Sequence, residues 1–210
     1  DNWSDEAISN GLRQEYNVNI SQGTERSNIM ASVNYLSNDG VLIAKSNFQR
    51  FTGRLAADFQ AKPWLKVGGN FAYSHGVTNQ MTSEGSSTST MNIFAFTNGV
   101  APIYPIYLRD GNKQPMYDKN GLLMYDYGNG MNAGLQRPAY ADSNAISAAI
   151  LNTNKADYNT LYASGFAEIR FLRDFKFTSN NTVNLLDSRS TSMMNPYYGQ
   201  AVADGGTIAK

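Results

Sequence analysis

The sequence of 210 residues contains no cysteine and a single histidine, His75. A chain without cysteine cannot form a disulfide bond, a zinc–thiolate site or a cysteine nucleophile. A Ser-His-Asp arrangement would have to be built on His75, and a lone histidine beside Ser74 is more typical of a surface residue. Metalloprotease, P-loop and dinucleotide-binding motifs are also missing. We therefore expect no catalytic residues and no cofactor.

An excess of charge of one sign is also lacking, because 17 Lys and Arg residues balance 17 Asp and Glu residues. A nucleic-acid-binding domain carries a basic patch, so this balance argues against a nucleic-acid partner. No apolar run approaches the roughly 20 residues that a membrane-spanning helix needs. The mean hydropathy of -0.42 does not exclude membrane strands, because these carry apolar residues only at every second position.

What the sequence does contain is a repeated alternation of apolar and polar residues. In residues 51–59, Phe51, Leu55 and Phe59 fall on one face of a strand, and Arg54 and Asp58 fall on the other. Similar alternation covers residues 15–20, 29–35, 65–73, 161–171 and 175–185. Turn signals such as Lys62-Pro63 and Arg173-Asp174 separate these segments. The sequence predicts an all-β antiparallel meander of about six strands.

The two faces of these strands allow two interpretations. In a large transmembrane β-barrel the charged face would line an aqueous lumen, and the apolar face would meet lipid. Small residues on the apolar face, such as Gly53 and Gly69, are tolerable against lipid and would fill a packed core poorly. A soluble antiparallel sandwich also alternates, so periodicity alone does not separate the two interpretations.

A long insert interrupts the meander and favours the barrel. Residues 76–157 contain four of the six prolines of the chain. Short helices are predicted within them at 91–100, behind Ser/Thr caps, and at 145–151. Asp110-Gly111 and Asn120-Gly121 predict tight turns of a small hairpin within it. Loops of this length are generally functional in compact domains. Short turns at one end and long loops at the other are typical of an outer-membrane barrel, so we expect an extracellular insert.

Tyrosines outside the strands are the best candidates for ligand binding. Their rings pack against apolar faces of sugars and peptides, and their hydroxyls form hydrogen bonds. The alternative is that they pack the core of the loop itself or form an interfacial girdle. The candidates are Tyr104, Tyr107, Tyr117, Tyr125, Tyr127, Tyr197 and Tyr198.

Four oxygen-bearing side chains in the insert also have the chemistry of calcium ligands. These are Asp110, Asn112, Asp118 and Asn120. Their spacing is not that of an EF-hand, and the preference of Asp and Asn for turns explains them without a metal. We expect no metal site.

Several motifs resemble the SusC/RagA-like TonB-dependent outer-membrane transporters of Bacteroidetes. Four features stand where the family pattern has them. They are Trp3, the pair Tyr35-Leu36 followed by Gly40, RFTGR at Arg50–Arg54 and WLKVG at Trp64–Gly68. The segments APIYPIY and MNPYYGQ are similar to family loops. The chain departs from the pattern at Ser21-Gln22-Gly23, where the family has Ser-Gly-Gly.

The resemblance implies a barrel of about twenty-two strands, of which this chain would be a wall segment without the plug. It implies import of a glycan or peptide at the cell outer membrane, with a SusD-like surface lipoprotein as partner and TonB engaged through the N-terminal part of the parent chain. We expect barrel strands at 1–75, the extracellular loop at 76–157, a barrel hairpin at 158–188 and a further extracellular loop from 189 to 210. The residues expected to face the lumen are Arg54, Asp58, Lys66, Glu168 and Arg170.

A different class of protein remains open as the alternative. A soluble carbohydrate-binding or adhesive β domain would carry the same alternation, with its apolar face packed against a second layer.

Overall fold

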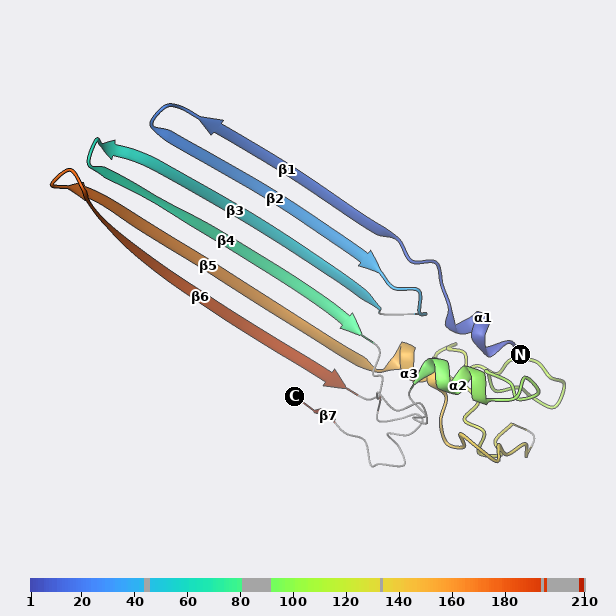
Figure 1. The fold of residues 1–210 in the computed structure, drawn as a ribbon. Helices are drawn as coiled ribbons and strands as arrows, with labels where there is room; N and C mark the ends of the chain where they lie inside the picture. The colour runs from blue at the N-terminus through green and yellow to red at the C-terminus, as the bar shows by residue number, and fades with distance from the viewer. Residues whose placement is uncertain (44–45, 81–91, 133, 194, 196–207, 210) are drawn as a thin grey trace.

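The computed structural model describes residues 1–43, 46–80, 92–132, 134–193, 195 and 208–209. Six long strands form one antiparallel sheet in which neighbours follow chain order (Figure 1). A short β7 (Ile208–Ala209) pairs with the end of the sixth strand. The predicted all-β meander of six strands is therefore confirmed. The strands are β1 (Arg13–Gly23), β2 (Ser27–Asp39), β3 (Asn47–Lys62), β4 (Leu65–Gln80), β5 (Thr153–Phe171) and β6 (Phe175–Met193).

The register of the sheet separates apolar from polar side chains. Residues paired directly across strands point to the same face, and successive residues point to opposite faces. One row of direct pairs crosses all six strands as Ile20, Ala31, Leu55, Phe71, Ala163 and Val183. The adjacent row, on the opposite face, is Asn19, Ser32, Arg54, Ala72, Tyr162 and Asn184. The sheet consequently has one apolar face and one polar face.

The apolar face has no second layer within the described residues. The side chains of Ile20, Leu55, Phe71 and Val183 are all exposed, and Leu55 retains 51% of its accessible surface. A sandwich would bury such residues against a facing sheet. The described part of the chain therefore forms a single-layered sheet.

Short turns gather at one end of this sheet and helices at the other (Figure 1). Residues 24–26, 63–64 and 172–174 form the turns. Gln22 and Gly23, at the end of β1, pair with Ile29 and Asn28. The helices at the other end are α1 (Trp3–Ala7), α2 (Ile93–Gly99) and α3 (Ala145–Leu151). None of these described helices is long and apolar enough to cross a membrane.

The strands run beyond the ends of the apolar alternation. Strand β4 continues to Gln80, which pairs with Asn154, so the connection between β4 and β5 spans residues 81–152 and not 76–157. Strand β6 likewise continues to Met193, beyond the expected residue 188. Backbone pairing needs no apolar side chain, which is why alternation alone underestimates these strands.

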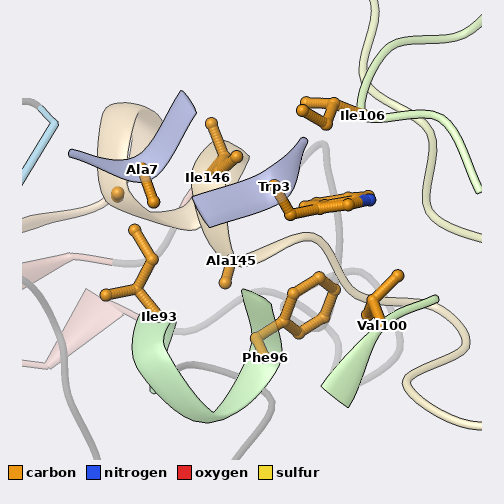
Figure 2. Close-up of a cluster of buried hydrophobic side chains, with 9 residues drawn as sticks. Trp3, Ala7, Ile93, Phe96, Val100, Ile106, Ala145 and Ile146 are labelled. Atoms are coloured by element: carbon orange, nitrogen blue, oxygen red, sulfur yellow. The ribbon is translucent and has the colours of Figure 1, made fainter. Parts of the chain in front are cut away.

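The hydrophobic core lies outside the sheet, among the helices (Figure 2). It joins the three helices and the segment that follows α2, with Trp3, Ala7, Ile93, Phe96, Val100, Ile106, Ala145, Ile146 and Ala149 as its buried members. We refer to α1 together with the described residues between 92 and 152 as the loop module. The N-terminal segment, predicted with the barrel strands, thus packs with the insert.

Two asparagines set the start of the insert's helices. The Asn92 side chain accepts hydrogen bonds from the backbone of Phe94 and Ala95, and α2 begins at Ile93. Met91, the predicted first residue of this helix, lies outside the described residues. The Asn144 side chain accepts from the backbone nitrogen of Ser147, and α3 has its predicted bounds. Asparagine at this position satisfies amides that have no partner within the first helical turn.

Candidate functional site

The polar face of the sheet carries every residue that was expected to face a lumen. Arg54 and Asp58 lie on β3, Lys66 lies on β4, and Glu168 and Arg170 lie on β5. Lys66 pairs directly with Glu168, and the register places all five opposite the face that holds Phe59 and Leu65.

Four of these five residues belong to two ion-pair groups near the turn end of the sheet. Lys66 Nζ lies 2.9 Å from Asp58 Oδ2. Glu168 lies between two cations, with Arg170 Nη2 at 2.9 Å and Lys176 Nζ at 3.0 Å from its carboxylate oxygens. Water screens surface ion pairs of this kind, so these pairs organise the charge of the face more than they stabilise the sheet.

A trough of about 850 Å³ lies on the polar face, toward the loop module. A row of uncharged hydrogen-bonding side chains crosses it, formed by Asn17, Asn34, Thr52, Ser74 and Thr160. The Thr52 and Ser74 hydroxyls are 3.3 Å apart. Arg50 and Arg54 flank this row on β3.

Arg50 is positioned by an aromatic stack on the same face. Its guanidinium carbon lies 5.9 Å from the centroid of the Phe48 ring, and the Phe48 and Tyr158 rings stack at 6.4 Å. Gly76 pairs directly with both Arg50 and Tyr158, and a Cβ at Gly76 would overlap the Tyr158 ring. The absence of a side chain at Gly76 lets this ring lie on the sheet.

The loop module places three of the candidate tyrosines against its own core. Tyr104, Tyr107 and Tyr125 pack on the buried cluster. The Tyr107 hydroxyl donates to Glu6 Oε1 at 2.6 Å, and its ring lies 5.4 Å from that of Tyr125. Burial raises the pKa of Tyr107, with the Glu6 carboxylate adding to the effect, and burial also raises the pKa of Tyr125.

The other candidate tyrosines differ in their surroundings. The Tyr127 hydroxyl lies 2.5 Å from Ser147 Oγ in α3. Tyr117 is 61% exposed and has the ring most accessible to a ligand among the five described candidates. Tyr197 and Tyr198 lie outside the described residues.

A buried polar cluster in the loop module was not predicted. Arg137 is 2% exposed, and its guanidinium lies 5.6 Å from the Trp3 ring and 5.4 Å from the Phe96 ring. Its Nη2 donates to the carbonyl oxygens of Asp126, at 3.2 Å, and Ser143, at 2.6 Å. Burial lowers the pKa of Arg137 and raises that of the Asp126 carboxyl. No local sequence pattern predicts this cluster, because Trp3 is far from Arg137 in the chain.

The oxygen-bearing residues considered as calcium ligands lie in two tight turns and form hydrogen bonds within them. Asp110 Oδ1 accepts from the backbone of Asn112 and Gln114, at 2.9 and 2.8 Å. Asp118 Oδ1 accepts from the backbone of Asn120 and Leu122, at 2.8 and 2.9 Å. The bridges Arg109–Pro115 and Tyr117–Leu123 complete the expected hairpin. Across the described residues, no group of three or more acidic or histidine side chains is gathered for a metal ion.

His75 lies on the apolar face at the loop end of β4. Its Nδ1 is 2.9 Å from Asn159 Oδ1, which also accepts a hydrogen bond from the Tyr73 hydroxyl at 2.8 Å. Ser74 points to the opposite face, where it meets Thr52. His75 and Ser74 therefore cannot act as a base and nucleophile pair.

Comparisons with known proteins give a likeness of fold. Neither the family models nor the curated proteins contain a match to this chain. Among solved structures, a RagAB peptide transporter is similar over 95% of this chain, with a TM-score of 0.63 and 20% identity. The RagAB peptide importer in its closed-closed and open-open states is similar over 94% and 93% of this chain, with TM-scores of 0.60 and identities of 18% and 19%.

The chain spans only about a fifth of the length of these neighbours, since it covers 21%, 20% and 20% of their chains. At these identities the likeness concerns the fold. The all-β meander with its long loop is thus a fold that a larger transport protein contains.

Proposed function

We propose that this chain is a wall segment of a SusC-like, TonB-dependent importer of the outer membrane. The observation that carries the proposal is the exposed apolar face that continues without interruption from β1 to β6. Exposed apolar patches of this size mark a surface that meets another apolar medium. Lipid is the medium that a single-layered, two-faced antiparallel sheet of this kind fits.

The dimensions of the apolar face support this proposal. On β5 the apolar positions run from Leu161 to Phe171. Ten residue steps of about 3.3 Å give about 33 Å along the strand. At a strand tilt of about 40° this projects to about 25 Å, which is the height of the apolar band of outer-membrane barrels.

The opposite face would then line an aqueous lumen, with Arg54, Asp58, Lys66, Glu168 and Arg170 among its charged groups. The loop module would lie at the extracellular mouth, where Tyr117 offers an exposed ring to a ligand and the module surface would contact a SusD-like lipoprotein. TonB would engage another part of the parent protein. The likeness to peptide importers favours a peptide over a glycan as the imported solute.

A matched pair of substitutions on β4 tests the membrane assignment. Phe71 and Asn70 are adjacent and exposed but lie on opposite faces. In the full-length protein, Phe71→Arg places a charge in lipid and should destabilise the folded barrel by about 2–4 kcal/mol. Asn70→Arg adds the same charge to the lumen and should change stability little. Urea unfolding of the protein in lipid vesicles measures both.

The soluble alternative predicts a different result. If the chain belonged to a soluble carbohydrate-binding domain, the protein would fractionate without membranes. Transport itself is tested by comparing uptake of labelled peptides and labelled oligosaccharides by cells that contain or lack the full-length protein. Peptide uptake that does not depend on the protein would contradict the proposed function.

A further inference from the structure

The trough on the polar face contains two arginines whose charge is not balanced by nearby acids. Arg50 and Arg54 both line it, and neither forms an ion pair with any residue in the described part of the chain. Glu15 also lines the trough, but it is paired with Arg13 at 2.6 Å and accepts from Asn34 at 3.3 Å. The trough therefore has a local excess of positive charge.

The other charges of the same face show how unusual these two arginines are. Lys66 is matched by Asp58, and Glu168 is matched by Arg170 and Lys176. Each of these cations near the turns thus has a carboxylate partner, whereas the two arginines of the trough have none among the described residues. A cleft lined by one sign of charge concentrates ligands of the opposite sign.

The spacing of the two arginines suits an extended ligand. They are four residues apart on β3, so their Cα atoms are separated by about 13 Å along the strand. An extended peptide has the same rise per residue, and its carboxylates at positions four apart match this separation. The Asn, Thr and Ser side chains between the arginines offer donors and acceptors to the amide groups of a peptide backbone.

Resting on the proposed function, we propose that the trough selects acidic peptides, with Arg50 and Arg54 pairing with carboxylates of an extended ligand. A guanidinium forms two parallel hydrogen bonds with a carboxylate, which a point charge cannot do. The stack of Phe48 on Tyr158 holds Arg50 at the trough before a ligand arrives. Arg54 is exposed and open to the same contact.

Binding of three matched peptides to the full-length protein tests this inference. The peptides are fluorescently labelled and identical except at two positions four residues apart, which hold Glu, Gln or Lys. Fluorescence anisotropy gives the affinity of each peptide in detergent solution. We expect the Glu peptide to bind at least about tenfold more tightly than the Gln peptide. Added salt should weaken the binding of the Glu peptide more than that of the Gln peptide.

Variants then assign the selectivity to the trough. Arg50→Gln and Arg54→Gln should each weaken the binding of the Glu peptide by about tenfold and leave the Gln peptide within about twofold. Arg189→Gln is the matched control, because Arg189 lies on the apolar side of the sheet at the end of β6. Arg189→Gln should change neither affinity. Urea unfolding midpoints of all variants show whether the fold is retained.

Two results would overturn the inference while leaving the proposed function in place. The first is equal affinity of the native protein for the Glu and Gln peptides. The second is that both arginine variants unfold more easily than the native protein but still prefer the Glu peptide to the Gln peptide as strongly as the native protein does. The arginines would then contact another part of the longer protein and not the ligand. Failure of all three peptides to bind would instead remove the peptide as the imported solute, and the inference with it.

Discussion

The indole nitrogen of Trp3 donates a hydrogen bond to the carbonyl oxygen of Tyr104, 3.0 Å away and 101 residues later in the chain. The Trp3 ring also lies 5.2 Å from that of Phe96 in α2, and Figure 2 shows both rings inside the helical cluster. Farther along α1, Glu6 accepts from the Tyr107 hydroxyl. The N-terminal segment is therefore a structural part of the loop module, and it ties the module to β1.

Truncating Trp3 should loosen the loop module and spare the sheet. Trp3 is 2% exposed, so Trp3→Ala should cost about 3–5 kcal/mol of local stability through the cavity it leaves. Trp3→Phe keeps most of the packing and should cost about 0.5–1.5 kcal/mol for the lost hydrogen bond. Hydrogen exchange of the amides of α2 and α3, compared with those of β3, measures the effect. Trp64→Ala, at an exposed position, is the control and should not change exchange in the helices.

The two helix-capping asparagines should differ in importance. Asn144 caps α3, and its side-chain nitrogen also donates to the buried carbonyls of Ile106 and Asp126, both at 2.9 Å. Among the described residues, the Asn92 side chain makes only the capping contacts with α2.

We expect Asn144→Ala to lower the stability of the loop module by about 2–4 kcal/mol, because the substitution removes the helix cap and also leaves two buried carbonyls without a hydrogen-bond donor. Asn92→Ala should cost about 1 kcal/mol. Resistance of the loop module to limited proteolysis ranks the two variants, and equal sensitivity would contradict the expectation.

A methyl group at Gly76 should disrupt the aromatic stack beside the trough. Its Cβ would overlap the Tyr158 ring, so Gly76→Ala should cost about 1–3 kcal/mol as an overpacked contact. Gly53→Ala is the control, because the Phe51 ring would lie 4.0 Å from its Cβ, which is an ordinary van der Waals contact. Urea unfolding of the full-length protein in lipid vesicles compares them. Combining Gly76→Ala with Tyr158→Ala should recover part of the loss, since the overlapping ring is gone.

The turn at Asp118 should depend on pH. Hydrogen bonds from the backbone of Leu122 and then Asn120 hold the pKa of Asp118 below its ordinary value of 3.8. Because the folded pKa is depressed, the ionised carboxylate stabilises the turn fully above pH 3.8, and this contribution is lost as pH falls through the folded pKa. The amide signal of isotope-labelled Leu122 should move over that acidic range. Asp118→Asn should abolish the movement, and an unchanged titration in this variant would contradict the assignment.

The sequence alone was sufficient to predict the strands and which side chains share a face of the sheet. Alternation with a period of two is a local property, so Leu55 and Arg54 could be placed on opposite sides before any pairing partner was known. The bounds predicted for α3 also agree with the structure, in which Asn144 caps the first turn of the helix. Strand ends were predicted less well, because pairing of Gln80 with Asn154 depends on backbone groups that the side-chain pattern does not report.

Only the tertiary structure decided where the core lies and which residues it uses. Trp3, Phe96 and Arg137 meet although long stretches of chain separate them, and no local pattern encodes such a meeting. The same holds for the tyrosines: the sequence marks them as outside the strands, but their packing against the loop core depends on distant partners such as Glu6 and Ser147. The local pattern of this chain thus determined a two-faced sheet. Long-range packing determined the loop module at its end and, through cross-strand register, the open positive charge of the trough.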